Sequence, residues 1–279
     1  MSATAAEVAR FLEEIGQLEA LMTSAGGDAA SITLDGVAGD AEAGPRDLAW
    51  SRSPQPASTG VGAGLLLCPG PAPDPVTLVA GRAVAVCTSP RLAMAEVLER
   101  FFADLAGDRE PVYAEPALAA IVAANHSWVK NATVGRGVRI AQHVVIGCSG
   151  MGYERDADGR LVPFPQLGGV VLEADVDVAA HASIQRGALG DTLLRRGAKI
   201  GPHVNVGHNV EVGEDALVTG HVQLGGGCRL GAGVVVWQSA SIANGVAVGE
   251  GAVIGMGACV RKDVGPGEVW AGNPARRLR

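Results

Sequence analysis

Residues 199–224 read KIGPHVNVGHNVEVGEDALVTGHVQL, and an aliphatic residue stands at every sixth position of this stretch, beginning with Ile200. The residue four places after each of these positions is small or branched. A period of six fits neither an α-helix nor the alternation of a simple strand, and it is typical of a hexapeptide parallel β-helix. The full aliphatic series is Leu194, Ile200, Val206, Val212, Val218, Leu224, Leu230, Val236, Ile242, Val248, Ile254 and Val260.

This period predicts a mainly β fold, a left-handed parallel β-helix that covers residues 128–279. Three hexads form one triangular coil, so residues about 18 apart lie one above the other at roughly 4.8 Å, the spacing of neighbouring strands. Two insertions interrupt the register, one over residues 147–169 and a shorter one at RGALGD, residues 186–191.

The N-terminal part has a different pattern and predicts a small α/β domain over residues 1–107. Thr4 and Glu7 have the spacing of a capping box, and a second helix is expected to begin at Ser89-Pro90. Residues 108–127 are expected to be a linker. Apolar residues with helical spacing follow the capping box, so the first helix is predicted to extend as far as Met22. They are Val8, Phe11, Leu12, Ile15, Leu18 and Met22.

Composition restricts the class of function. The chain of 279 residues has 40 glycines, 4% aromatic residues and a net charge of −7 without a run of like charges, which argues against a nucleic-acid partner. Five scattered cysteines without a Cys-x-x-Cys pair indicate neither a disulfide framework nor a structural zinc site, and they suit a reducing cytoplasm. No apolar stretch is long enough for a transmembrane segment.

The 18-residue geometry places one histidine beside a bare backbone amide. Gly226 follows His208 by 18 residues and is expected directly above its imidazole. A base beside an unobstructed N–H is what attack on an acyl carbonyl requires, because the imidazole takes the proton of the nucleophile and the amide holds the oxyanion. His203 and His221 are also 18 apart and should stack, either as a polar stripe or in a cleft between subunits. The remaining histidines, His126, His143 and His181, are read as solvent-facing polar residues.

A metal site is the alternative use of His208. Gamma-class carbonic anhydrases share this β-helix and place a second histidine ligand five residues after a Val-Gly-His triplet. Val206-Gly207-His208 matches the triplet, but Gly213 stands where the second ligand is needed. The sequence therefore predicts no metal site.

Several motifs together resemble the UDP-3-O-(3-hydroxyacyl)glucosamine N-acyltransferases of lipid A biosynthesis. The N-terminal stretches ITLDGVAGDAEAGPRDLAW and AVCTSPRLAMAEVLERFF are similar to the nucleotide-recognition domain of that family. The central motifs are Gly152-Tyr153, Pro165-Gln166-Leu167-Gly168, Arg186-Gly187-Ala188-Leu189, Asp191-Thr192 and His208-Asn209-Val210.

The resemblance implies a general base at His208, an oxyanion-binding amide at Gly226 and direct transfer of an acyl group from a thioester to a sugar amine. Asp191 is the candidate for a carboxylate that orients the imidazole. The family implies a homotrimer, with acyl carrier protein or coenzyme A thioester as co-substrate and no permanently bound cofactor. Candidate substrate-binding residues are Trp50, Tyr153, Gln166, Asn209, His203 and His221.

The chain also departs from the family pattern. Gln185 stands in a usually acidic position, Gly201 replaces a frequent aspartate, and Val246 stands where a second functional histidine is expected. Ser53 and Pro56 replace an asparagine and a tyrosine that grip uracil, which puts uridine recognition in doubt.

The final stretch, GEVWAGNPARRLR, resembles coenzyme A-dependent acetyltransferases instead, and its arginines are either phosphate contacts or a solvated basic tail. The sequence thus predicts an N-acyltransferase for a nucleotide-linked amino sugar. An acetyl-CoA-dependent nucleotide-sugar N-acetyltransferase is the nearest alternative. A carbonic-anhydrase-like metal protein and a non-catalytic β-helix module are the more distant ones.

Overall fold

The computed structural model describes residues 2–24, 27–38, 43–51, 63–70 and 81–279, so Ser53 and Pro56 lie outside the described residues. The chain forms two compact units. The first comprises Met1–Gly107 with Met151–Pro165, and the second comprises Asp108–Gly150 with Gln166–Arg279. No helix in the described ranges has the length and apolar character needed to cross a membrane.

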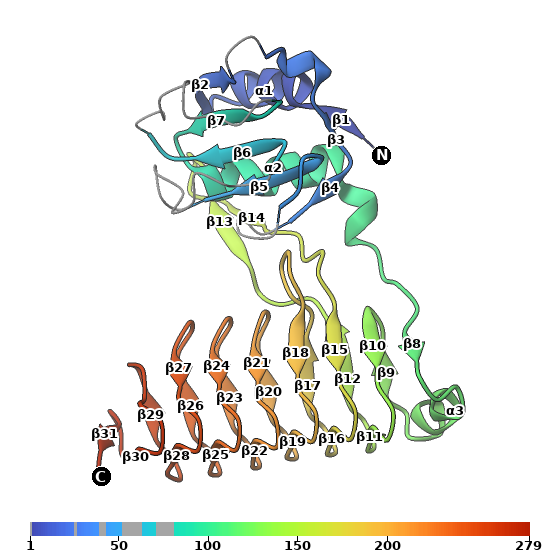
Figure 1. Cartoon of the computed structure of the whole chain (residues 1–279), viewed down its shortest axis with the longest axis vertical. Coiled ribbons are helices and arrows are strands. Elements are labelled where there is room, and N and C mark those ends of the chain that lie inside the picture. The colour runs from blue at the N-terminus through green and yellow to red at the C-terminus, as the bar shows by residue number, and fades with distance from the viewer. Residues whose placement is uncertain (1, 25–26, 39–42, 52–62, 71–80) are drawn as a thin grey trace. The chain divides into compact units, whose positions relative to one another are not determined.

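The second unit is a left-handed parallel β-helix with three sheets, each built from one short strand per coil (Figure 1). Sheet 1 contains β8 (Val112–Tyr113), β10 (Ala132–Val134), β15 (Val170–Leu172), β18 (Thr192–Leu194), β21 (Glu211–Val212), β24 (Arg229–Leu230) and β27 (Ala247–Val248). Sheet 2 contains β11 (Arg139–Ile140), β16 (Asp177–Val178), β19 (Lys199–Ile200), β22 (Leu217–Val218), β25 (Val235–Val236), β28 (Val253–Ile254), β30 (Val269–Ala271) and the antiparallel β31 (Arg276–Arg277). Sheet 3 contains β9 (Trp128–Val129), β12 (Val145–Cys148), β17 (Ser183–Gln185), β20 (Asn205–Val206), β23 (Gln223–Leu224), β26 (Ser241–Ile242) and β29 (Cys259–Val260).

The predicted hexapeptide period is confirmed by the strand register and by burial. Val206 pairs with Leu224, 18 residues later, and with Ile184, 22 residues earlier, because the four-residue insertion lies between β17 and β20. Both Val206 and Val210 are fully buried, as are their equivalents in neighbouring coils, and they belong to one continuous aliphatic core. Burial of each such side chain stabilises the prism by about 1.5–3 kcal/mol.

Residues 108–127, which we expected to be a linker, instead form the first layer of the β-helix unit. The strand β8 pairs in parallel with β10, and α3 (Ala117–Ala124) follows it. Leu118 and Val122 of α3 are buried in the β-helix core. This segment closes the N-terminal end of the prism, whose aliphatic interior would otherwise face water.

The longer insertion also differs from the expected boundaries. Residues 151–165 form an antiparallel hairpin of β13 (Tyr153–Arg155) and β14 (Leu161–Pro163), and this hairpin belongs to the N-terminal unit. Glu154 on β13 forms an ion pair of 2.5 Å with Arg91 of α2 (Pro90–Phe101). The chain therefore leaves the β-helix after Gly150 and returns to it at Gln166.

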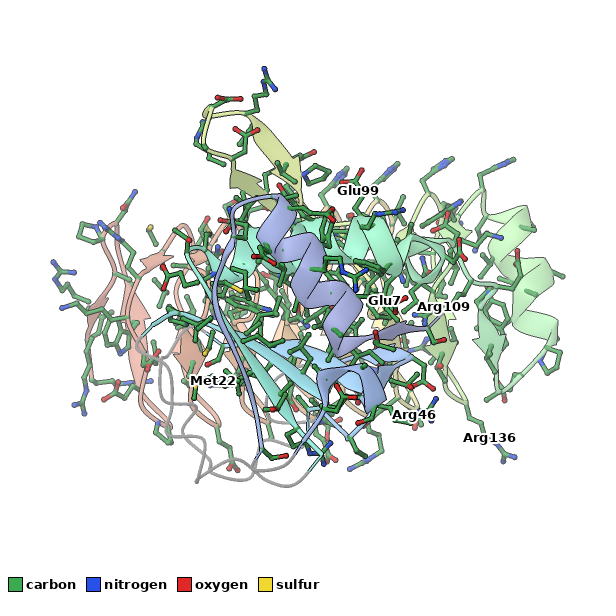
Figure 2. The ribbon with its side chains drawn as sticks, turned by 90° about the horizontal axis from the view of Figure 1, so that it is seen from above. Glu7, Met22, Arg46, Glu99, Arg109 and Arg136 are labelled. Carbon is green, nitrogen blue, oxygen red and sulfur yellow. The ribbon has the colours of Figure 1, made fainter. Side chains whose placement is uncertain are left out.

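The remaining N-terminal unit is a five-stranded sheet in the order β2-β7-β6-β5-β4, with β2 antiparallel to its neighbour. The capping box on α1 (Ala5–Glu14) is confirmed, because Thr4 and Glu7 exchange both hydrogen bonds, and Figure 2 labels Glu7 on this helix. The other elements are β1 (Ala3–Thr4), β2 (Leu18–Thr23), η1 (Ala29–Ser31), β3 (Thr33–Leu34), β4 (Gly36–Val37), β5 (Asp47–Trp50), β6 (Leu65–Cys68), β7 (Ala83–Cys87) and η3 (Ala103–Ala106).

The extension of the first helix to Leu18 and Met22 is wrong. Gly16 has a φ of +69°, a left-handed conformation that ends the helix, and Leu18 and Met22 lie in β2. A helix and a strand both place Leu18 and Met22 on one face, because residues four apart lie on the same side of either element. The apolar spacing alone therefore does not distinguish the two at these positions.

Candidate active site

His208 lies at the corner where the chain passes from β20 in sheet 3 to β21 in sheet 1. The buried Val206 and Val210 fix both sides of this corner, and His208 and Asn209 between them are half-buried. Both insertions leave the β-helix at the same corner, one and two coils earlier, since they follow β17 and β12. The repeat therefore brings His208 and both irregular loops together.

Gly226 of the next coil lies directly against the imidazole, as the 18-residue spacing predicts. A Cβ atom on Gly226 would lie 2.6 Å from Nε2 of His208, closer than real Cβ contacts allow. The coils are fixed by hydrogen bonds from the Gly207 amide to the Leu224 carbonyl, 2.9 Å, and from the Gly227 amide to the His208 carbonyl, 2.8 Å. Within the described part of the chain the Gly226 amide donates no hydrogen bond. The backbone of Gly226, which has no side chain, thus lies close to Nε2.

The side chain of Asn209 sets the tautomer of His208. Its Oδ1 lies 3.1 Å from Nδ1 of the ring and also accepts the amide of Ala188 at 2.9 Å. An amide oxygen can only accept, so Nδ1 is the donor, and in the neutral ring the lone pair lies on Nε2. Asn209 is itself fixed, because its Nδ2 donates to the Gly190 carbonyl at 2.9 Å and its backbone amide donates to Thr192 Oγ1 at 2.8 Å. The site therefore holds the ring by Nδ1 and leaves Nε2 as the nitrogen that can act as a base.

The hypothesis that Asp191 orients the imidazole does not match this geometry. Asp191 is exposed, and its Oδ1 accepts the amide of Gly169 at 2.6 Å. It closes the shorter insertion onto the longer one, while the neutral amide of Asn209 holds the ring.

We expect Asn209→Ala to lower kcat/KM by about 10-fold, the loss of one good hydrogen bond to an oriented group. The variant loses the hydrogen bond that holds Nδ1 of His208. It also loses the two hydrogen bonds from the Asn209 side chain to Ala188 and Gly190 of the RGALGD loop. Steady-state kinetics measure the effect. Asn209→Asp keeps an acceptor oxygen for Nδ1 and should retain more activity than the alanine variant. Equal activity of wild type and Asn209→Ala would contradict the role.

Residues at the start and end of the longer insertion lie near the ring of His208. A Cβ on Gly150 would lie 2.9 Å from Oε1 of Gln185, 3.3 Å from Cδ2 of His208 and 3.5 Å from Oε1 of Gln166. Three polar side chains therefore converge on the backbone of Gly150. The sequence indicated Gln166 as a substrate-binding residue but gave Gly150 no role, because its contacts depend on the path of an insertion outside the repeat.

The buried side chain of Arg186, in the shorter insertion, joins it to the longer one. It is fully buried, and it donates from Nε to the Gly168 carbonyl at 2.7 Å and from Nη2 to the Leu167 carbonyl at 3.0 Å. Burial is the main cause that lowers the pKa of its guanidinium, with the nearby Arg109 acting in the same direction. A buried Arg can satisfy several carbonyls of an irregular loop at once, which explains this residue in the RGALGD segment.

His203 and His221 stack as predicted, with ring centroids 4.8 Å apart. They belong to a column of five exposed histidines, completed by His126, His143 and His181, whose residues all have φ between +53° and +61°. This column runs along the corner between sheets 2 and 3, so His203 and His208 lie at opposite ends of β20. The left-handed turn conformation, which histidine tolerates better than most residues, accounts for the column.

Other predicted site residues lie in the N-terminal unit. Trp50 ends β5 and lines a hollow of about 290 Å³ with Ser51, Pro69, Ser89, Pro90 and Arg91. Tyr153 on β13 is half exposed. In the second unit, Val246 points into the core and is buried, so it offers no substitute for a functional histidine.

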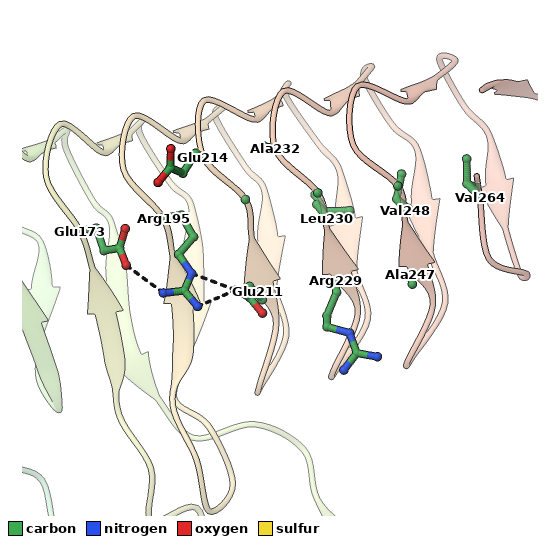
Figure 3. Close-up of a pocket in the computed structure, with 13 residues that line it drawn as sticks. Glu173, Arg195, Glu211, Glu214, Arg229, Leu230, Ala232, Ala247, Val248 and Val264 are labelled. Carbon is green, nitrogen blue, oxygen red and sulfur yellow. Dashed lines mark hydrogen bonds and ion pairs between the residues drawn. The ribbon is translucent and has the colours of Figure 1, made fainter. Parts of the chain in front are cut away.

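A larger hollow of about 550 Å³ lies on sheet 1 (Figure 3). Arg195 bridges Glu173 at 2.9 Å and Glu211 at 2.7 Å there, so its guanidinium is shared between two carboxylates. No cluster of three or more histidine, cysteine or acidic side chains within the described ranges is arranged to hold a metal ion. The corner at His208 remains the best candidate for chemistry.

The fold and this corner define a hexapeptide-repeat β-helix protein with an oriented imidazole beside a bare amide. A stretch of the chain is 42% identical over 79 residues to a UDP-3-O-acylglucosamine N-acyltransferase of Francisella tularensis subsp. holarctica, covering 28% of this chain and 23% of that protein. A second match is 45% identical over 76 residues to the enzyme of the same name from Methylobacillus flagellatus, and it covers 27% of this chain and 21% of that protein. The predicted resemblance is thus confirmed: the chain is a divergent relative of these enzymes.

The match spans less than a quarter of the length of these curated relatives. Among solved structures, the UDP-N-acetylglucosamine O-acyltransferase of Moraxella catarrhalis RH4 has a TM-score of 0.48 and 16% identity, covering 61% of this chain and 70% of that chain. No protein-family profile matches the chain.

Proposed function

We propose that the protein is an N-acyltransferase that moves an acyl group from a thioester to the amine of an amino sugar. The observation that carries this proposal is the closeness of Nε2 of His208 to the side-chain-free Gly226, where a Cβ would lie 2.6 Å from that nitrogen. The other ring nitrogen is held by Asn209, and within the described residues the Gly226 amide has no acceptor. A base and an oxyanion donor within one notch are the two groups that acyl transfer needs.

The reaction then proceeds by direct attack. The amine nitrogen forms a bond to the thioester carbon, and His208 Nε2 accepts a proton from it. The carbonyl oxygen becomes an oxyanion and accepts a hydrogen bond from the Gly226 amide. The C–S bond breaks as the oxyanion collapses, and the proton on His208 passes to the departing thiolate. No covalent intermediate on the protein and no bound cofactor takes part.

The donor is either an acyl carrier protein thioester or a coenzyme A thioester. Near the end of the chain, Arg261, Lys262 and Arg276 line a hollow of about 300 Å³ together with Trp270. Arg277 instead forms an ion pair of 3.1 Å with Glu268. Three cations in one hollow favour a phosphate-bearing donor, which suits either carrier.

We expect the active assembly to be a homotrimer, as the resemblance implies, and a cyclic arrangement of identical chains suits a parallel β-helix. We place the reaction in the cytoplasm, where the five cysteines, all free in the structure, would stay reduced.

A donor panel tests this function. The purified protein is incubated with amino sugars, free and nucleotide-linked, and with matched acyl chains on carrier protein and on coenzyme A, while free thiol is followed. Transfer from a long acyl chain on carrier protein would assign it the donor of the lipid A enzymes. Transfer from acetyl-CoA would assign it to sugar acetylation, and no thiol release with any pair would refute acyl transfer.

A nucleotide on the acceptor predicts a role for Trp50. Its ring lines a hollow with Arg91, where a base could stack and a phosphate could pair. We expect Trp50→Ala to raise KM for a nucleotide-linked acceptor by about 10-fold, as loss of base stacking predicts. The free amino sugar should show no change, which makes it the internal control. Equal effects on both acceptors would place Trp50 outside nucleotide recognition.

A further inference from the structure

Gln185 lies at the same corner as His208 and is not explained by the repeat. It ends β17, next to the inward Ile184, so its side chain points out of the prism. Its Oε1 and Cδ2 of His208 both lie within 3.3 Å of one point, the position of a Cβ on Gly150. An amide oxygen and the ring carbon bonded to Nε2 therefore both face the backbone of Gly150.

The charged groups near the neighbouring Arg186 balance one another. Arg186 and Arg109 supply two positive charges, and Asp108 and Asp191 supply two negative ones, all within electrostatic reach of Arg186. Asp108 accepts a hydrogen bond from Asn131, and Asp191 accepts the Gly169 amide. No carboxylate in the described residues forms a hydrogen bond to the ring of His208. The polar groups at the ring edge are thus neutral amides.

A neutral acceptor has a specific consequence for an amine. An amine attacks a carbonyl only when its lone pair is free, whereas a nearby carboxylate stabilises the protonated ammonium and raises its pKa. An amide oxygen accepts an N–H without favouring the ammonium to that degree. It also orients the nitrogen, because one N–H is held while another faces the base.

We propose that Gln185 binds the attacking amine without holding it as the ammonium, as a carboxylate at this position would. This inference rests on the proposed N-acyl transfer. One N–H of the amine donates to Oε1 of Gln185, and a second proton moves to Nε2 of His208 as the nitrogen forms its bond to the thioester carbon. The C–S bond then breaks, and the proton passes to the thiolate. Gln185 itself gains and loses no proton.

The test compares Gln185→Glu and Gln185→Leu with wild type, using kcat and KM for the amino sugar from pH 5 to 9. Gln185→Glu should move the acid limb of kcat upward by about one pH unit, because the new carboxylate holds the ammonium. Gln185→Leu should raise KM for the amino sugar about 3- to 10-fold without moving that limb, since it removes only an acceptor. Gln238→Glu, on an exposed corner between sheets 2 and 3, is the matched control.

Binding without donor separates an effect on the amine from an effect on the imidazole. At pH 6, Gln185→Glu should bind the amino sugar about 3- to 10-fold more tightly than wild type does, as a charge-assisted hydrogen bond predicts. The variant and wild type should bind the same sugar with a hydroxyl in place of the amine equally well. An unchanged kcat profile in Gln185→Glu, or equal gains for both ligands, would overturn the role of Gln185. A wild type that transfers no acyl group would instead refute the proposed function and, with it, this inference. If Gln185→Glu does not fold, the KM of Gln185→Leu decides, and an unchanged value rejects the proposal.

Discussion

Replacing His208 with alanine is expected to lower kcat by about 100-fold or more, the contribution of a positioned general base. The imidazole is the basic group that contacts Gly226, and Asn209 fixes its protonation pattern. The half-buried ring is not part of the aliphatic core, so the melting temperature and the oligomeric state should not change. Thiol release at saturating donor measures the effect.

His203→Asn is the matched control. The sequence offered His203 as a substrate-binding residue, but its exposed imidazole lies at the opposite end of β20 from His208, and asparagine tolerates its φ of +56°. The variant should leave kcat near the wild-type value. Full activity of His208→Ala would favour a non-catalytic β-helix module. Stoichiometric zinc that is lost with either histidine would favour metal chemistry instead.

The period of six residues predicts most of the β-helix. Inward positions such as Val206 and Leu224 stack because a coil has a fixed length, so strand register follows from sequence arithmetic. The same arithmetic placed Gly226 on His208, and the structure agrees. A repeat makes long-range contacts predictable, since each residue meets its own equivalent one coil away.

The prediction is incomplete where the repeat stops. The partner of the imidazole is Asn209, its sequence neighbour, whereas a carboxylate was expected at Asp191. The orientation of Asn209 depends on Ala188 and Gly190 in an irregular loop, and the period says nothing of such loops. The assignment of residues 151–165 to the N-terminal unit depends on contacts with α2 that likewise have no periodic signal.

Replacing Gly226 with alanine is expected to lower kcat/KM by about 100- to 1000-fold, the effect of losing one oxyanion-hole donor. The new Cβ would lie 2.6 Å from Nε2 and 2.8 Å from Cε1 of His208, so the ring must rotate away. The methyl group would also occupy the notch in which the acyl oxygen reaches the Gly226 amide. Both the base and the donor would be displaced by one added carbon.

The backbone itself should tolerate this change. Gly226 is not among the glycines with positive φ, so alanine can adopt its conformation, and the displaced atom belongs to a rotatable side chain. Gly220→Ala is the matched control in the same β-helix, because its Cβ would lie 3.3 Å from the nearest atom, the Pro202 carbonyl oxygen. Both variants should melt near the wild-type temperature, and only Gly226→Ala should lose activity. Equal activity of the two variants would mean that neither the ring position nor the Gly226 amide contributes to the rate, and the active site would have to be sought elsewhere on the chain.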